Sequence, residues 1–175
     1  MRLAALLGVL CLGACSTQPP QRLAQTSAVT PVVGGNSQRE IQARSVESKS
    51  YDLVKESLLD AIAEAGLIAQ AESHVATMLK NTAESFGKSN LIYEQAEIIP
   101  FCSSTIAWKL FEEDAEQIAM CPLTIALYTL TGNPHTVHVV WRQYNGDSPA
   151  HQAANALLQS LVSKTIERSV STRLY

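Results

Sequence analysis

The spacing of hydrophobic residues along the chain predicts helices in some segments and strands in others. Residues 51–65 place apolar side chains three or four positions apart, which is the spacing of one buried helix face. Ser50 before this segment and Gly66 after it are residue types that commonly cap helices. The same spacing recurs later and predicts further helices at residues 75–86, 103–111 and 150–168.

The segments between these helices have the composition of strands. Residues 123–130 are apolar on both faces, as in the centre of a sheet, and residues 137–144 follow after a Gly132-Asn133-Pro134 turn. These two segments predict a hairpin. Strands mixed with helices and with a hairpin indicate an α+β domain. Weaker strand signals cover residues 44–49, 67–71 and 91–101, the last interrupted near Pro100.

The N-terminus has the pattern of a secretory signal. A positive start, Met1-Arg2, precedes an apolar stretch over residues 3–14 that is too short to span a bilayer. The end of this stretch, Leu12-Gly13-Ala14-Cys15, resembles a bacterial lipobox, in which the cysteine is acylated and becomes the first mature residue. We therefore expect acyl chains on Cys15, and Ser16 after it favours sorting to the outer membrane.

A polar segment separates this leader from the domain. Residues 16–39 contain no acidic residue and are rich in Ser, Thr, Gln, Pro and Gly, a composition that buries too little apolar surface to fold. The expected organisation is a lipoprotein signal peptide at 1–14, lipidated Cys15 with a flexible tether at 15–40, and one domain at 41–175.

Composition and charge exclude several classes of function. The 175 residues are 46% hydrophobic and 17% charged, with a formal net charge of -3. That balance lacks the basic footprint of a nucleic-acid-binding protein. No apolar run is long enough for a transmembrane helix. The common catalytic and nucleotide-binding motifs are absent from the sequence, which favours a protein that is not an enzyme.

Three runs of the domain form a recognisable combination: Tyr93-x-x-Ala96-Glu97-Ile98-x-x-Phe101-Cys102-Ser103, Cys121-Pro122-x-x-Ile125-x-x-Tyr128 and Pro134-x-x-Val137-x-Val139. Together they resemble domain-of-unknown-function family 302 (DUF302). Gly66 and His74 also match the positions of a glycine and a histidine in that family, and the likeness extends over residues 44–168. The resemblance implies one helix on a mostly antiparallel four- to five-stranded sheet, short middle helices, a closing C-terminal helix and often a homodimer, but no reaction.

Cys102 and Cys121 are the only cysteines of the expected domain. An even pair in an oxidising compartment predicts a disulfide, which would stabilise the fold by about 3 kcal/mol on the chain-entropy model. Two alternatives stay open. The cysteines are two buried thiols, or they belong to a metal, haem or redox site together with His74, which lies between a strand and a helix.

Glu97 and Arg142 are two further candidates for a ligand or metal site. Strand alternation directs Glu97 towards the core, where it needs Arg142 or His74 as a partner, unless a bulge before Pro100 turns it outward. His138 and Arg142 share the second face of their strand, which predicts an exposed or dimer-facing surface.

The other charged residues have simpler interpretations. His135 and His138 point to opposite faces of a strand unless His135 lies in the turn, and we expect His151 to face solvent. The acidic run at 112–116 is typical of a solvated helix end.

The sequence therefore predicts a lipid-anchored protein of the bacterial cell envelope, on the periplasmic face of the outer membrane. Its expected role is non-catalytic binding of a small ligand or an envelope protein, with the membrane as a partner through Cys15 and no cofactor. The alternative hypothesis is a redox, metal or haem module that uses Cys102, Cys121 and His74. A structural homodimer is a third possibility.

Overall fold

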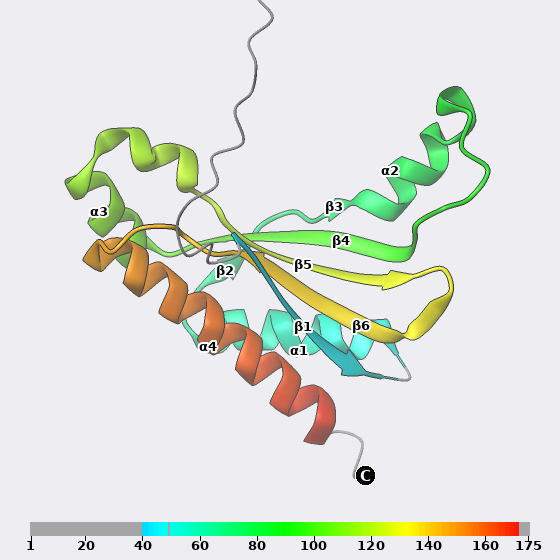
Figure 1. Cartoon of the computed structure of the whole chain (residues 1–175). Helices are drawn as coiled ribbons and strands as arrows, with labels where there is room; N and C mark the ends of the chain where they lie inside the picture. Colours follow the sequence, from blue (N-terminus) through cyan, green and yellow to red (C-terminus); the bar gives the residue numbers. More distant parts are fainter. Residues whose placement is uncertain (1–39, 49, 172–175) are drawn as a thin grey trace, which may run out of the picture. The chain divides into compact units, whose positions relative to one another are not determined.

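The computed structural model describes residues 40–48 and 50–171. The predicted signal peptide, Cys15 and the tether as far as residue 39 lie outside the described residues. Figure 1 shows a twisted antiparallel sheet with the two long helices, α1 and α4, on one of its faces. No helix among the described residues is long and apolar enough to cross a membrane.

The sheet has six strands in the order β1-β6-β5-β4-β2, with β3 also paired to β4. All of its pairings are antiparallel, which confirms the expected α+β fold with its mostly antiparallel sheet and closing helix. The sheet exceeds the expected four to five strands because residues 67–71 and their neighbours supply two short strands. The strands are β1 (Ile41–Glu47), β2 (Ile68–Ala69), β3 (Ser73–His74), β4 (Tyr93–Cys102), β5 (Leu123–Leu130) and β6 (Asn133–Arg142).

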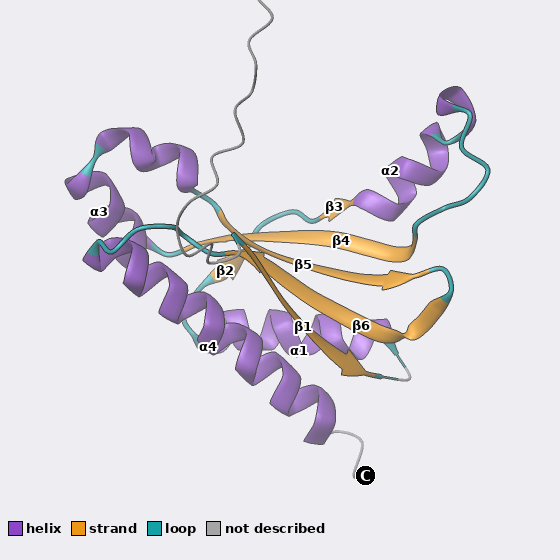
Figure 2. Ribbon diagram, viewed as in Figure 1, coloured by secondary structure: helices purple, strands orange, loops and turns teal. Residues whose placement is uncertain are grey.

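The helices begin and end close to where their caps predict (Figure 2). The Ser50 side chain accepts a hydrogen bond from the Leu53 backbone N–H, and Gly66 has a left-handed φ of 72° after the helix end. Ser103 caps the third helix in the same way, from Ile106. The helices are α1 (Tyr51–Glu64), α2 (Val75–Thr82), α3 (Ser104–Glu113) and α4 (Pro149–Ser171), with short 3-10 helices η1 (Glu84–Phe86) and η2 (Ala115–Met120).

The core lies between the sheet and the two long helices. Alternate residues of β4, β5 and β6 point towards α1 and α4 and are fully buried, because strand side chains alternate between faces. The intervening residues form the second face, which is only partly covered. The largest fully buried side chains of these three strands are Phe101, Ile99, Leu123, Ile125, Leu127 and Val137.

The expected interruption of the fourth strand at Pro100 is wrong. Pro100 lies inside β4, paired with Thr124 of β5. The Pro100 carbonyl points away from β5 and accepts a hydrogen bond from Gln70 N. The Pro100 nitrogen, which carries no hydrogen, points the same way, into the gap between β2 and β3. Proline is tolerated at such an edge, because no ladder hydrogen bond to β5 is lost there.

Candidate functional site

The predicted site residues fall into two separate places, and the first is a polar cluster beside β4. His74 of β3 lies opposite Glu97 of β4, so both side chains are on the helix-covered face. His74 Nδ1 is 2.9 Å from Glu97 Oε1. Alternation therefore places Glu97 correctly, and of its two expected partners His74 is the one that the structure supplies. The bulge in β4 lies between Tyr93 and Gln95, not before Pro100.

Helix α1 contributes two further side chains to this cluster. Lys55 Nζ is 2.9 Å from Glu97 Oε2 and 2.5 Å from Glu72 Oε2. The Tyr51 hydroxyl lies 3.4 Å from Glu97 Oε2 and 3.3 Å from the Leu127 carbonyl oxygen. The cluster thus joins α1 to β4 and to the segment before β3.

The charges of this cluster support one another. Burial alone would raise the pKa of Glu97, but hydrogen bonds from Lys55 and His74 outweigh burial and hold that pKa below its ordinary value. Burial would lower the pKa of Lys55, and its bonds to Glu72 and Glu97 raise it instead. Burial, followed by the charge of Glu97, raises the pKa of Tyr51. The lysine and Glu97 are therefore both charged at neutral pH.

The same cluster contains the ligand types of a metal site. One ligand atom from each of Glu72, His74 and Glu97 lies within 4.8 Å of the others, and no second group of this kind occurs among the described residues. The Lys55 ammonium already bridges the two carboxylates, so a metal ion would have to displace it. The geometry is that of a salt-bridge network that fixes the sheet edge.

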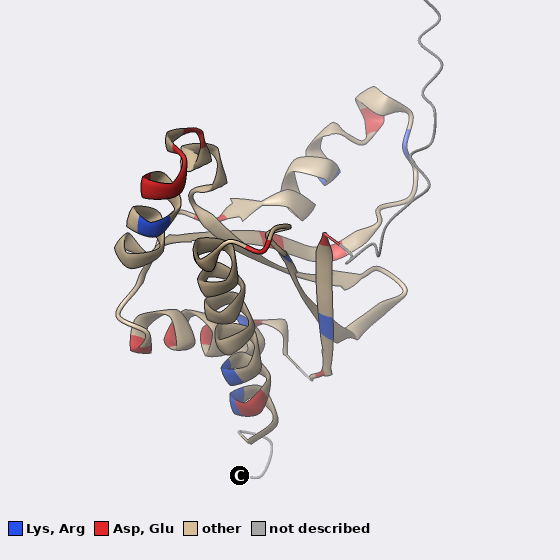
Figure 3. Ribbon diagram, turned by 60° about the vertical axis from the view of Figure 1, so that its left-hand side comes forward, with Lys and Arg blue, Asp and Glu red and all other residues tan. Residues whose placement is uncertain are grey.

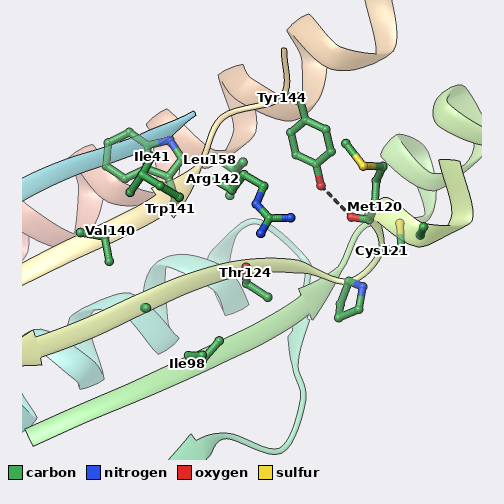
Figure 4. Close-up of a pocket in the computed structure, with 13 residues that line it drawn as sticks. Ile41, Ile98, Met120, Cys121, Thr124, Val140, Trp141, Arg142, Tyr144 and Leu158 are labelled. Atoms are coloured by element: carbon green, nitrogen blue, oxygen red, sulfur yellow. Dashed lines mark hydrogen bonds between the residues drawn. The ribbon is translucent and has the colours of Figure 1, made fainter. Parts of the chain in front are cut away.

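The second place is a pocket on the partly covered face of the sheet, where that face meets η2. Its volume is about 400 Å³, and Arg142 is the one charged side chain among the residues lining it. Figure 4 shows the Arg142 guanidinium extending into the space between Tyr144 and Thr124. The lining is otherwise apolar or uncharged: Ile41, Ile98, Ala119, Met120, Cys121, Pro122, Thr124, Ala126, Val140, Trp141, Tyr144 and Leu158.

Hydrogen bonds fix the η2 side of this pocket. The Tyr144 hydroxyl donates to the Met120 carbonyl oxygen at 2.7 Å, and burial raises the pKa of Tyr144 to about 12, so it stays a donor. Arg142 Nε is 3.3 Å from Glu40 Oε1, and that ion pair is exposed to solvent. The guanidinium Nη atoms have no other partner among residues 40–48 and 50–171, so they remain available to an anionic group.

The two cysteines lie at neighbouring strand ends. Cys102 is the last residue of β4 and is exposed, whereas Cys121 precedes β5 and is half-buried. Both thiols are free in the structure, and the expected disulfide stays a prediction. His74 lies opposite Glu97, five residues from Cys102 along β4, which corresponds to about 16 Å. The structure thus does not bring His74 to the cysteines, nor Arg142 to Glu97.

The remaining histidines complete the comparison with the sequence. His138 lies on the partly covered face, as expected, and stacks on Tyr128 with ring centroids 4.6 Å apart. His135 and His138 belong to no metal group among the described residues. The expectation for His151 is wrong. It is half-buried and its Nε2 lies 3.0 Å from Gln117 Oε1, a partner that becomes a neighbour only through the fold.

The acidic run at 112–116 is exposed, and Figure 3 shows acidic residues at the end of α3, whose preceding turn carries Lys109. Two of its members nevertheless act within the fold. Glu113 Oε1 accepts a hydrogen bond from the Ala150 backbone N–H at the start of α4, and Asp114 Oδ1 accepts one from Glu116 N. The run is a solvated helix end that also caps two helices.

Comparison with known proteins decides the family. Residues 42–167 match the family described as "Domain of unknown function DUF302". The chain belongs to the DUF302 family. A crystal structure of an uncharacterized conserved DUF302 protein from Bacillus stearothermophilus is similar in fold, with a TM-score of 0.55. The two sequences are 14% identical, and the similarity covers 74% of this chain and 97% of that chain. No curated protein matches the chain.

Proposed function

We infer that this DUF302 protein is a lipid-anchored protein of the bacterial cell envelope whose domain binds a ligand or partner without turning it over. The pocket at Arg142 carries this proposal, because a concave apolar site with one cation suits a molecule with an apolar body and an acidic group. The lipobox at Cys15 supports the anchor, and Ser16 supports the periplasmic face of the outer membrane.

Exposed apolar side chains beside the pocket also favour a binding role. Ile41 is 55% exposed and Ile98 is 36% exposed, and both line the pocket. Leu130 continues this surface along β5. A partner protein or a second copy of the chain would bury these side chains, so a homodimer is part of the proposal.

Metabolic labelling with an alkyne fatty acid tests the anchor. The wild-type protein should carry the label and sediment with membranes. Cys15→Ser should lose both properties, because its side chain cannot be acylated on sulfur. A labelled Cys15→Ser protein, or an unlabelled wild type, would contradict the anchor.

The pocket is tested with 1-anilinonaphthalene-8-sulfonate, an apolar dye that carries one anion. Ala126→Phe should fill the pocket and weaken dye binding about tenfold or more. Ala63→Phe adds the same side chain at an exposed position of α1, outside the pocket, and should bind like the wild type. Equal binding by the wild type and both variants would exclude this pocket.

A turnover assay addresses the non-catalytic part of the proposal. Hydrolysis or transfer that is lost on changing Glu97 or His74, with the fold intact, would show that the polar cluster is an active site. Neither residue lines the pocket at Arg142, so we expect no such activity.

A further inference from the structure

The two free thiols flank one end of the ladder between β4 and β5. Phe101 of β4 and Leu123 of β5 are the last pair of this ladder. Cys102 directly follows Phe101, and Cys121 lies two positions before Leu123. Extending this register would place residue 102 opposite residue 122, so Cys102 and Cys121 lie diagonally across the end of the ladder, and their charges are close enough to interact. Both thiols are free, and neither lies beside His74.

Cys102 also lines a cleft of about 520 Å³ that is distinct from the pocket at Arg142. The cleft lies between the α1–β2 connection and the start of α3. Its walls combine the exposed Ile68 side chain with the hydroxyl groups of Ser104 and Thr105. Such a mixture suits a peptide-like molecule that has both amide groups and apolar side chains.

The surroundings of the two thiols differ. Gln70 Nε2 donates a hydrogen bond to Cys102 Sγ at 3.4 Å, and this contact would remain favourable to a thiolate. Cys102 directly precedes Ser103, the N-cap of α3, so the positive end of a ten-residue helix lies next to it. Cys121 has no such donor among the described residues, and it is half-buried. Burial, together with the charge of Cys102, raises the pKa of the Cys121 thiol.

We propose that Cys102 and Cys121 form a dithiol that exchanges with small or peptide disulfides entering the cleft beside Gln70. In the first step the Cys102 thiolate attacks one sulfur of the disulfide and expels the other half as a thiolate, which leaves a mixed disulfide on Cys102. The Cys121 thiol, losing its proton to water, then attacks Cys102 Sγ and releases the second thiolate. The substrate disulfide is reduced by two electrons and the chain is oxidised to a Cys102–Cys121 disulfide.

Cys121 also lines the pocket at Arg142, whereas Cys102 lines the separate cleft; because dye binding and thiol exchange are measured separately, each proposal can fail alone. The test uses oxidised glutathione and the full chain with Cys11→Ser and Cys15→Ser, so that the two domain thiols are the reacting groups. The reduced chain should release two molecules of glutathione and become an intramolecular disulfide. Peptide mass mapping should locate that bond between residues 102 and 121.

Single variants separate the two roles. Cys121→Ser should stop as a glutathione adduct on residue 102. Cys102→Ser should react about tenfold more slowly, because the remaining thiol is half-buried. Equal rates for the two variants, or two stable adducts on the wild type, would overturn the proposal. If a variant fails to fold, the wild type decides: mapping after brief exposure must find the first adduct on Cys102.

Gln70 is a positioning residue in this scheme. Gln70→Leu should slow the first step about threefold, because Cys102 Sγ loses its hydrogen-bond donor, whereas Gln70→Asn, which keeps an amide, should lose less of the rate. Gln95→Leu, an exposed change elsewhere on the same sheet, should leave the rate unchanged. A wild-type rate in Gln70→Leu would show that Gln70 does not assist Cys102.

Discussion

The two faces of the sheet are built from alternate residues of the same strands, and they differ in how far they are covered. On the helix-covered face, side chains such as Phe101 and Ile125 are fully buried against α1 and α4. On the partly covered face, Ile98 and Val140 surround a pocket with a single cation. Strand alternation thus lets one segment supply both a core and the lining of a pocket, and substitutions on the two faces should have different consequences.

The largest expected effect contrasts two residues of β4 that lie on opposite faces of the sheet. Phe101→Ala should lower the free energy of unfolding by about 3–5 kcal/mol, because it leaves a cavity in the core. Ile98→Ala should lower it by less than about 1 kcal/mol, because Ile98 is already partly exposed. Urea denaturation measures both. Similar losses at the two positions would contradict the division between the faces.

The next effect concerns the connection that carries the chain from β6 to the covering helix α4. Gly146 has a φ of 149°, and a Cβ there would collide with Nδ1 of His151. Gly146→Ala should therefore cost about 1–3 kcal/mol by thermal or urea denaturation. Gly132→Ala is the matched control, because nothing lies within 4 Å of a Cβ at that turn. A control as damaging as the test variant would refute this explanation.

A smaller effect, with a pH dependence, is expected at the polar cluster on the covered face. Glu97→Gln should cost roughly 1–2 kcal/mol at pH 7, because it weakens the bonds to Lys55 and His74. The folded-state pKa of Glu97 lies below the ordinary 4.5. The Glu97 carboxylate therefore stabilises the folded state fully at a pH above its unfolded-state pKa. This stabilisation is lost as the pH falls from the unfolded-state pKa through the folded-state pKa.

Urea denaturation of the wild type and Glu97→Gln at neutral and acid pH checks this dependence. The difference in unfolding free energy between the two proteins should shrink as the pH falls below about 4.5. A difference that is constant with pH would mean that the carboxylate charge contributes nothing.

The smallest effect on stability is expected at Arg142, on the partly covered face. Its ion pair with Glu40 is solvent-exposed, so Arg142→Ala should change the unfolding free energy by less than about 0.5 kcal/mol. The same variant should weaken binding of the sulfonate dye several-fold, because the pocket loses its cation. Lost stability with unchanged dye binding would reverse the roles assigned to the two faces.

Local patterns were sufficient for much of the fold. The periodicity of α1, its Ser50 cap and Gly66 predict that helix closely. The turn signal at residues 132–134 predicts the hairpin, but the turn is tighter than expected, because β6 already begins at Asn133. The path of residues 67–74 was not predictable in detail. This segment forms two short strands instead of one: β2 pairs with β4 after Pro100, and β3 pairs with β4 before it. The division depends on pairing with β4, a distant segment.

The candidate sites were predictable only in part. Alternation directs Glu97 inward and supplies His74 as a partner, but Lys55 and Glu72 were missed. Lys55 lies one helical turn after Tyr51, beside the buried stripe of α1, and that position was an available signal. The pocket at Arg142 and the Gln117 partner of His151 had no local signal, because distant segments create both.

The order of the strands also has a consequence for how the protein is made. β1 is the first strand of the domain to be synthesised, yet its sole ladder partner in the sheet is β6, the last strand. β1 therefore leaves the ribosome without a partner and stays unpaired until nearly the whole chain has followed. The anchor proposed at Cys15 requires export, and a domain that cannot finish its sheet early would remain threadable through a translocation channel.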